Sequence, residues 1–142
     1  MSSIAELCAE HREVEEQARL LLRIAAAECP DSAMVAGIRW RLAQMLHDHC
    51  VREDQAVYGR LLGSGDAVAI VQAEHYREDH GGIARGVAGY IAAWPVQRIG
   101  CEWQAFGVAT RNIVAMIFER IRLEERHLYA QLARVEAHRA AA

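Results

Sequence analysis

Two short stretches of the sequence place an acidic side chain four residues after a larger polar one. Glu53 follows His49 at this interval, and Glu124 follows Arg120 in the same way. Residues four apart lie on one face of a helix, so His49 and Glu53 can direct an imidazole and a carboxylate at one metal ion, or at two adjacent ions bridged by the carboxylate. Imidazole and carboxylate ligands together favour iron among the redox metals.

The two stretches align with each other without a gap. Each has an acid at +4, a second acid at +5 and a tyrosine at +9. Asp54 and Tyr58 of the first stretch therefore correspond to Glu125 and Tyr129 of the second. The alignment predicts that the two stretches play related parts in one site.

A weaker repeat precedes each of these stretches. The pair Glu10-His11, with Val14 three positions on, matches Asp79-His80 with Ile83. We therefore expect two helical hairpins related by a pseudo-twofold axis that passes through a shared site. Because the repeat supplies two acids that can bridge metal ions and no cysteine ligand, the sequence favours a di-iron site in the core of a helical bundle.

Four helices must position these residues. Two prolines and a glycine-containing turn break the helical pattern, at Pro30, Pro95 and 63–66. The predicted helical segments are 3–29, 32–62, 67–94 and 97–137, each with apolar residues at a 3.6-residue period. Short connections join antiparallel neighbours, so we expect one all-α domain over residues 1–142, an up-down-up-down antiparallel four-helix bundle.

Ionisable residues stand in the apolar stripes of all four predicted helices. They are His11, His49, Glu53, His80, Arg120 and Glu124. Burial of such groups costs several kcal/mol each unless they are paired or bind a metal. A hydrogen-bonded His49–Glu53 pair without metal is the alternative for the second helix, but four helices with the same feature indicate a common site.

Composition limits the class of protein. The net charge is −3 and no basic stripe occurs, so we expect no nucleic-acid partner. No 18-residue apolar span and no leader peptide occur, so we expect no membrane association. The four cysteines lack the C-x₂-C spacing of zinc and redox motifs, which favours free thiols in a reducing cytoplasm.

The ordered set of residues resembles the hemerythrin-like family, also called the HHE cation-binding domain, over nearly the whole chain. Members of that family carry a histidine in the first helix, His-x₃-Glu in the second, a histidine in the third and a motif similar to His-x₃-Glu-Glu in the fourth. The resemblance implies that the metal ligands are His11, His49, Glu53, His80, Glu124 and Glu125.

The sequence departs from the family pattern in the fourth and third helices. Arg120 replaces the fourth-helix histidine, and a guanidinium cannot ligate a metal because it stays protonated. In the third helix, His75 is an alternative to His80, and the two residues lie about 140° apart around the helix. Tyr76, one turn before His80, is a candidate oxygen ligand. Two, one or no bound ions are compatible with these changes.

The resemblance implies a non-haem iron protein, a monomer or homodimer, that binds or senses O₂, NO or peroxide. One alternative is an enzyme on the same site, with peroxidase-like, catalase-like or iron-delivery activity, because Arg120 can stabilise a bound anion. A second alternative is a regulatory bundle whose metal site has degenerated.

Overall fold

The structure, a computed structural model, describes all 142 residues, and every regular element in it is helical. The helices are α1 (Ile4–Ala25), α2 (Ser32–Glu53), α3 (Gly59–Leu62), α4 (Ala67–Ala93), α5 (Val96–Cys101), α6 (Trp103–Leu123) and α7 (Tyr129–Ala141). Two π-helical turns lie among them, η1 (Asp54–Tyr58) and η2 (Glu124–Leu128). The predicted all-α class is confirmed.

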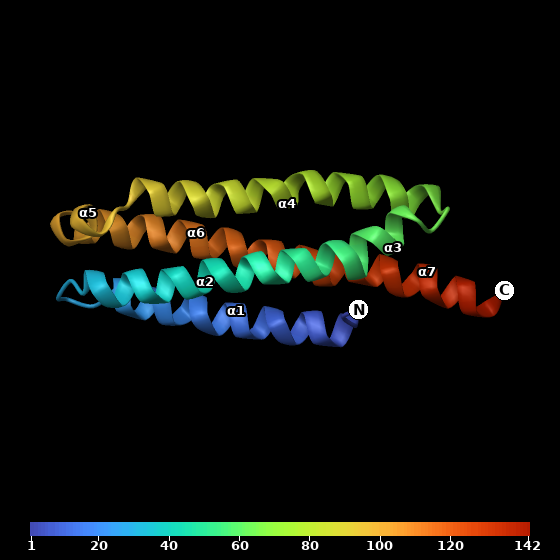
Figure 1. Cartoon of the computed structure of the whole chain (residues 1–142), viewed down its shortest axis with the longest axis horizontal. Helices are drawn as coiled ribbons and strands as arrows, with labels where there is room; N and C mark the ends of the chain where they lie inside the picture. Colours follow the sequence, from blue (N-terminus) through green and yellow to red (C-terminus); the bar gives the residue numbers. More distant parts are fainter.

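The bundle is built of long helical segments, which we call rods. Two of these rods consist of several elements that follow one another without a break. One is formed by α2, η1 and α3, and the other by α6, η2 and α7. With α1 and α4 they lie side by side and run in alternating directions (Figure 1). The structure differs from the single helix that the sequence predicts over 97–137, because α5 stands apart at the start of this segment. The chain leaves helical geometry at Glu102, with φ −125° and ψ 47°, so α5 and α6 are separate helices.

Side-chain caps fix where three of the long helices begin. Ser3 caps α1 in a capping box with Glu6, and Asp31 caps α2 through the backbone N–H of Met34. Asp66 caps α4 through the N–H of Ala69. The predicted breaks before α2 and α4 therefore coincide with caps that satisfy helix N-termini.

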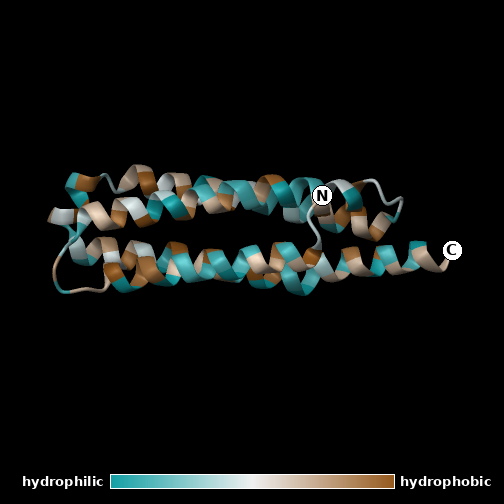
Figure 2. Cartoon of the chain, turned by 60° about the horizontal axis from the view of Figure 1, so that its bottom comes forward, coloured by the Kyte–Doolittle hydropathy of each residue, from teal (hydrophilic) through white to brown (hydrophobic).

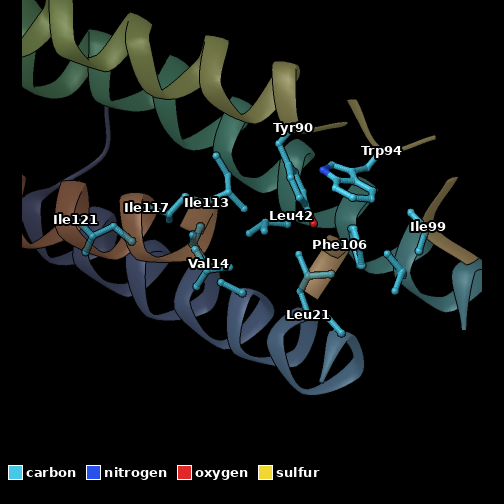
Figure 3. Packing of buried hydrophobic residues seen from close by; sticks show 14 residues of the cluster. Val14, Leu21, Leu42, Tyr90, Trp94, Ile99, Phe106, Ile113, Ile117 and Ile121 are labelled. Carbon is cyan, nitrogen blue, oxygen red and sulfur yellow. The ribbon is translucent and has the colours of Figure 1, made fainter. Parts of the chain in front are cut away.

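Apolar side chains form two separate clusters along the bundle. The larger cluster joins α1, α2, α4, α5 and α6, and Figure 3 shows residues such as Leu21, Leu42 and Phe106 meeting between these helices. The smaller cluster, which includes Leu7 and Leu132, joins α1 with η1, α3, the first turns of α4, η2 and α7. Each fully buried side chain of this size contributes about 1.5–3 kcal/mol. The two clusters hold the rods together on both sides of the layer between them.

Hydrophilic and hydrophobic residues alternate along every long helix (Figure 2). None of the helices combines the length and the apolar character needed to cross a membrane. In the layer between the two apolar clusters, each of α1, α2 and the α6–η2 rod turns ionisable side chains inward, and the buried set there includes His11, His49 and Glu124.

Candidate metal centre

Four buried ionisable side chains converge between the two apolar clusters. His11 comes from α1, His49 and Glu53 from α2, and Glu124 from η2. One ligand atom of each lies within 4.8 Å of those of the other three. We call these residues the four-residue cluster. All four were predicted from the sequence, and three separate rods bring them together.

The π-helical turns explain how tyrosines join this layer. Tyr58 lies five residues after Glu53, and Tyr129 lies five residues after Glu124. In an α-helix five residues leave the two side chains about 140° apart. A π turn, with its i→i+5 hydrogen bonds, brings such residues back onto one face. Both tyrosines are consequently buried beside the acids, which gives the +9 tyrosine of the sequence repeat a structural reason.

Each histidine of the cluster is held by a carboxylate on its outer nitrogen. Nδ1 of His11 lies 2.8 Å from Oε1 of Glu125, and Nδ1 of His49 lies 2.8 Å from Oε2 of Glu10. A carboxylate can only accept here, so each Nδ1 carries the proton and each Nε2 presents a lone pair. The two Nε2 atoms face each other at 3.0 Å. Such an arrangement needs a proton or a cation between the rings.

The two carboxylates of the cluster have different surroundings. Glu124 places Oε2 at 3.2 Å from Nε2 of His11, while its Oε1 accepts a hydrogen bond of 2.5 Å from Nε of Arg120. Glu53 accepts a 2.9 Å hydrogen bond from the Tyr129 hydroxyl on Oε1, whereas its Oε2 is buried without any partner. Both oxygens of Glu124 therefore have polar partners, whereas only one oxygen of Glu53 accepts a hydrogen bond.

These surroundings shift the pKa values of the cluster in opposite directions. Burial, and then the charge of Glu124, raises the pKa of Glu53 well above its usual value. Burial also acts on Glu124, but the imidazoles of His11 and His80 and the guanidinium of Arg120 overcome it and lower the pKa of this carboxyl. Without a cation, the site therefore favours ionised Glu124 and disfavours a second negative charge on Glu53.

His80 on α4 lies at the edge of the cluster. Its Nδ1 is 3.4 Å from Oε1 of Glu124 and 3.6 Å from Oε2 of Glu53, and neither ring nitrogen makes a hydrogen bond. Buried polar atoms without partners are rare in folded proteins, and here three of them belong to two neighbouring residues, Glu53 and His80. An iron ion fits this donor set, because imidazole nitrogens and carboxylate oxygens are ligands that iron accepts.

The other candidates from the sequence lie outside the four-residue cluster. Glu125 is 30% exposed and bonds to the outer nitrogen of His11 and to Arg12. The side chain of His75 is 71% exposed and lies 3.6 Å from Asp79. Tyr76 is partly buried, with its ring 5.2 Å from the guanidinium of Arg120. The structure thus places His80, rather than His75, beside the acids.

Glu10 is the site residue that the sequence analysis did not assign. It holds Nδ1 of His49 and accepts a second hydrogen bond of 2.6 Å from Arg52. The signal was its place directly before His11 in the repeated pair. Its partner is a histidine on another helix, so no spacing along the chain reveals the contact.

A small cavity of about 20 Å³ adjoins the cluster. Its lining contains five polar residues, His11, His49, His80, Arg120 and Glu124, and five apolar ones, Val14, Leu46, Ile83, Ile117 and Ile121, which we call the apolar wall. This space is sufficient for about one water-sized molecule. Cys50 also borders it, and burial raises the pKa of this thiol to about 12, so it stays protonated.

Comparison with known proteins agrees with this geometry. The sequence profile described as the Hemerythrin HHE cation binding domain matches residues 2–132. No curated protein and no solved structure matches the chain. The matched region contains every residue of the four-residue cluster together with His80 and Arg120. The chain therefore belongs to the hemerythrin HHE cation-binding domain family.

Proposed function

We propose that this protein binds non-haem iron at the four-residue cluster and uses it to bind or sense a small molecule such as O₂, NO or peroxide. The observation that carries the proposal is the pair of Nε2 atoms of His11 and His49, which face each other at 3.0 Å beside the unpartnered Oε2 of Glu53. A bound cation explains all three atoms at once. A metal-free regulatory bundle accounts for the two Nε2 atoms only through a proton shared between the rings, and it leaves Oε2 of Glu53 without a partner.

The residues favour iron over several other metals. The ligand atoms are nitrogen and oxygen, and no cysteine belongs to the cluster. Thiolate ligands would favour copper(I), and an all-oxygen set would favour magnesium or calcium. Zinc accepts the same donors as iron, and elemental analysis of the purified protein distinguishes the two. Iron, once bound, would supply a redox-active Lewis acid next to the small cavity. Glu10 and Glu125 would keep the two imidazoles oriented for ligation.

The cavity supports a ligand of very few atoms. Its volume is about 20 Å³, and Ile117, Val14 and Ile83 form part of its apolar wall. A diatomic gas or peroxide is of this size, whereas an organic substrate requires several hundred Å³. The apolar wall disfavours further water, and the Tyr129 hydroxyl, whose oxygen lies 2.9 Å from Oε1 of Glu53, donates a proton to that hydrogen bond.

The contacts of Arg120 leave one end of its guanidinium free. Its Nε is engaged with Glu124, and its Nη2 is engaged with the Tyr58 hydroxyl and the Tyr76 carbonyl, whereas its Nη1 makes no hydrogen bond. Arg120 also borders the cavity, so it can offer a donor to a bound anion. A peroxidase-like or catalase-like activity is therefore the second candidate function, and turnover of hydrogen peroxide by wild type but not by Arg120→Ala would favour it over binding or sensing.

The remaining parts of the proposal concern architecture and setting. We infer an up-down-up-down four-helix bundle to which α5 is an addition. We place the protein in a reducing cytoplasm, which suits the free thiols of Cys29 and Cys101 on its surface. We expect a monomer or homodimer without a nucleic-acid or membrane partner.

Iron content and thermal stability test the proposal together. Protein expressed with added iron should retain it and should lose melting temperature when a chelator removes it, because a ligand at 100 times its Kd adds about 2.7 kcal/mol to stability. His49→Gln should abolish both effects. His47→Gln is the matched control, since His47 is exposed two residues away. An iron-free protein whose melting temperature ignores iron and chelator would refute the proposal.

Nitric oxide tests the second half of the proposal. Added anaerobically to the ferrous protein, it should change the visible spectrum of wild type and of His47→Gln, but not of His49→Gln. Iron-loaded wild type that shows no spectral change with NO, O₂ or hydrogen peroxide would exclude a gas-binding or peroxide-binding role.

A further inference from the structure

Arg120 occupies the place that corresponds to His49 in the internal repeat. Each residue lies one turn before a buried glutamate, and each is followed by a π-helical turn and a buried tyrosine. By the pseudo-twofold relationship, a histidine at 120 would complete a second nitrogen-containing site beside the first. The chain has a permanently charged side chain there instead.

The guanidinium of Arg120 is fixed by three separate contacts. Its Nε donates to Oε1 of Glu124 at 2.5 Å, and its Nη2 donates to the Tyr58 hydroxyl at 2.8 Å and to the Tyr76 carbonyl at 2.7 Å. Its side chain is also buried. A group held in this way does not swing out to admit a second ion between Glu124 and Tyr58.

Glu124 directs its two oxygens to different partners. Oε2 lies 3.2 Å from Nε2 of His11, on the side of the four-residue cluster. Oε1 lies 2.5 Å from Arg120 and 3.4 Å from Nδ1 of His80, on the opposite side. A carboxylate placed between two ions uses its oxygens in the same divided way. Here Oε2 contacts His11 of the four-residue cluster, and Oε1 accepts a hydrogen bond from the guanidinium of Arg120.

Formal charge leads to the same result. Glu53 and Glu124 bring two negative charges to the dry layer when both are ionised, and Arg120 brings one positive charge. One divalent ion leaves this buried group with a small net positive charge. A second divalent ion would add two more positive charges next to the guanidinium, and uncompensated buried charge is strongly unfavourable.

We propose that the protein binds a single iron ion per chain at the four-residue cluster, and that the guanidinium of Arg120 stands in the position of a second ion. The inference rests on the proposed function, because it concerns the same site. It differs from the di-iron site that the acid repeat favours, and it selects one ion among the two, one or none that the change at Arg120 left open. His80 remains at the edge of the cluster, beside the guanidinium rather than beside a second metal.

Anaerobic titration with Fe(II), with Co(II) as a spectroscopic substitute, tests the inference by stoichiometry. Wild type should bind one ion per chain, and its ferric form should give the electron paramagnetic resonance signal of an isolated high-spin ion. Arg120→His supplies the missing nitrogen and removes the charge, so it should bind two ions, which couple magnetically and lose that signal. Arg120→Gln removes the charge without supplying an imidazole and should stay at one ion.

The two outcomes for wild type do not depend on the fold of any variant. Two ions per wild-type chain would overturn the single-ion inference and leave the proposed function standing. No ion in wild type would overturn the proposed function itself. A folded Arg120→His protein that still binds one ion would show that Arg120 is not what excludes the second ion. A second ion in Arg120→Gln would show that charge alone excludes it and that an imidazole is not needed.

Discussion

The Nε2 atoms of His11 and His49 lie 3.0 Å apart, and a glutamate holds the opposite nitrogen of each ring. The carboxylates of Glu125 and Glu10 select the Nδ1-protonated tautomer, so both inner lone pairs point into the same small space. Burial, and then the proximity of His11, lowers the pKa of His49 and keeps its ring neutral. Neutral imidazoles are the form that binds a metal.

Glu10→Gln tests the supporting role of this carboxylate. The amide keeps the size of the side chain but weakens its hold on Nδ1 of His49, so iron affinity should fall about 10- to 100-fold. Competition with a calibrated iron chelator measures the change, and circular dichroism checks that helix content is unchanged. Glu13→Gln, an exposed acid one turn away on α1, should leave affinity unaltered. Equal affinities for Glu10→Gln and wild type would mean that Glu10 does not orient the ring.

The starts of α2 and α4 and the members of the four-residue cluster could be predicted from the sequence because they depend on local rules. Breaks at Pro30 and at 63–66 precede helix starts that Asp31 and Asp66 cap. The 3.6-residue period favoured His80 over His75, which lies about 140° away around the helix, and the structure places His80 near Glu53 and His75 on the exposed side. Patterns within one helix were sufficient for these features.

Other features depend on contacts between helices and had no clear local signal. The π turns η1 and η2 appear in the sequence only as a tyrosine five residues after an acid. The end of α5 at Cys101 has no proline beside it, so the two helices read as one. The bond from Glu10 to His49 joins α1 to α2, and the engagement of Arg120 with Tyr58 joins α6 to η1. Such pairings become visible only when the rods are packed.

Tyr129→Phe should destabilise the metal-free protein and also weaken iron binding. The substitution removes the only hydrogen bond to Oε1 of Glu53 and leaves a buried acceptor unpaired, at a cost of about 1–3 kcal/mol in the free energy of unfolding. Urea denaturation of chelator-treated protein measures this loss, and iron titration measures the affinity.

Tyr58→Phe is the control that the repeat provides. It removes a partner of Arg120 and should cost similar stability, but it leaves Glu53 in place and should change iron affinity less. If Tyr58→Phe weakens iron binding as much as Tyr129→Phe, the hydroxyl of Tyr129 has no special part in positioning Glu53.

Asp66 should make stability depend on pH in the acidic range. The hydrogen bond from the Ala69 N–H, and then Arg134, lowers the pKa of Asp66 in the folded protein. A carboxyl with a lowered folded pKa stabilises the fold above its unfolded value of about 3.9, and this contribution is lost as the pH falls through the folded pKa. Asp66→Ala should therefore melt about 2–4 °C below wild type at pH 7. This difference in melting temperature should disappear below about pH 4.

Melting curves of chelator-treated protein between pH 3 and 8 measure this effect without interference from the metal site. Asp66→Asn should keep most of the cap while removing the pH-dependent part, because asparagine caps helices about as well as aspartate does. Glu74→Ala, at an exposed position of α4, should follow wild type. A gap between wild type and Asp66→Ala that stays constant across this range would exclude the carboxylate as its source.

Glu53→Gln should separate stability from function at the site. The pKa of Glu53 is raised by burial and by Glu124, which means that its negative charge is unfavourable in the metal-free fold. A neutral side chain of the same size removes that cost, so the metal-free variant should gain about 0.5–2 kcal/mol in free energy of unfolding. The same change removes a charged ligand atom, so the variant should lose the increase in melting temperature that iron gives wild type.

Glu16→Gln on the exposed face of α1 should alter neither quantity. A variant that is less stable without metal would show that the carboxylate itself stabilises the metal-free fold, whereas a more stable variant that no longer binds iron would show that the chain tolerates a buried charge for the sake of the metal.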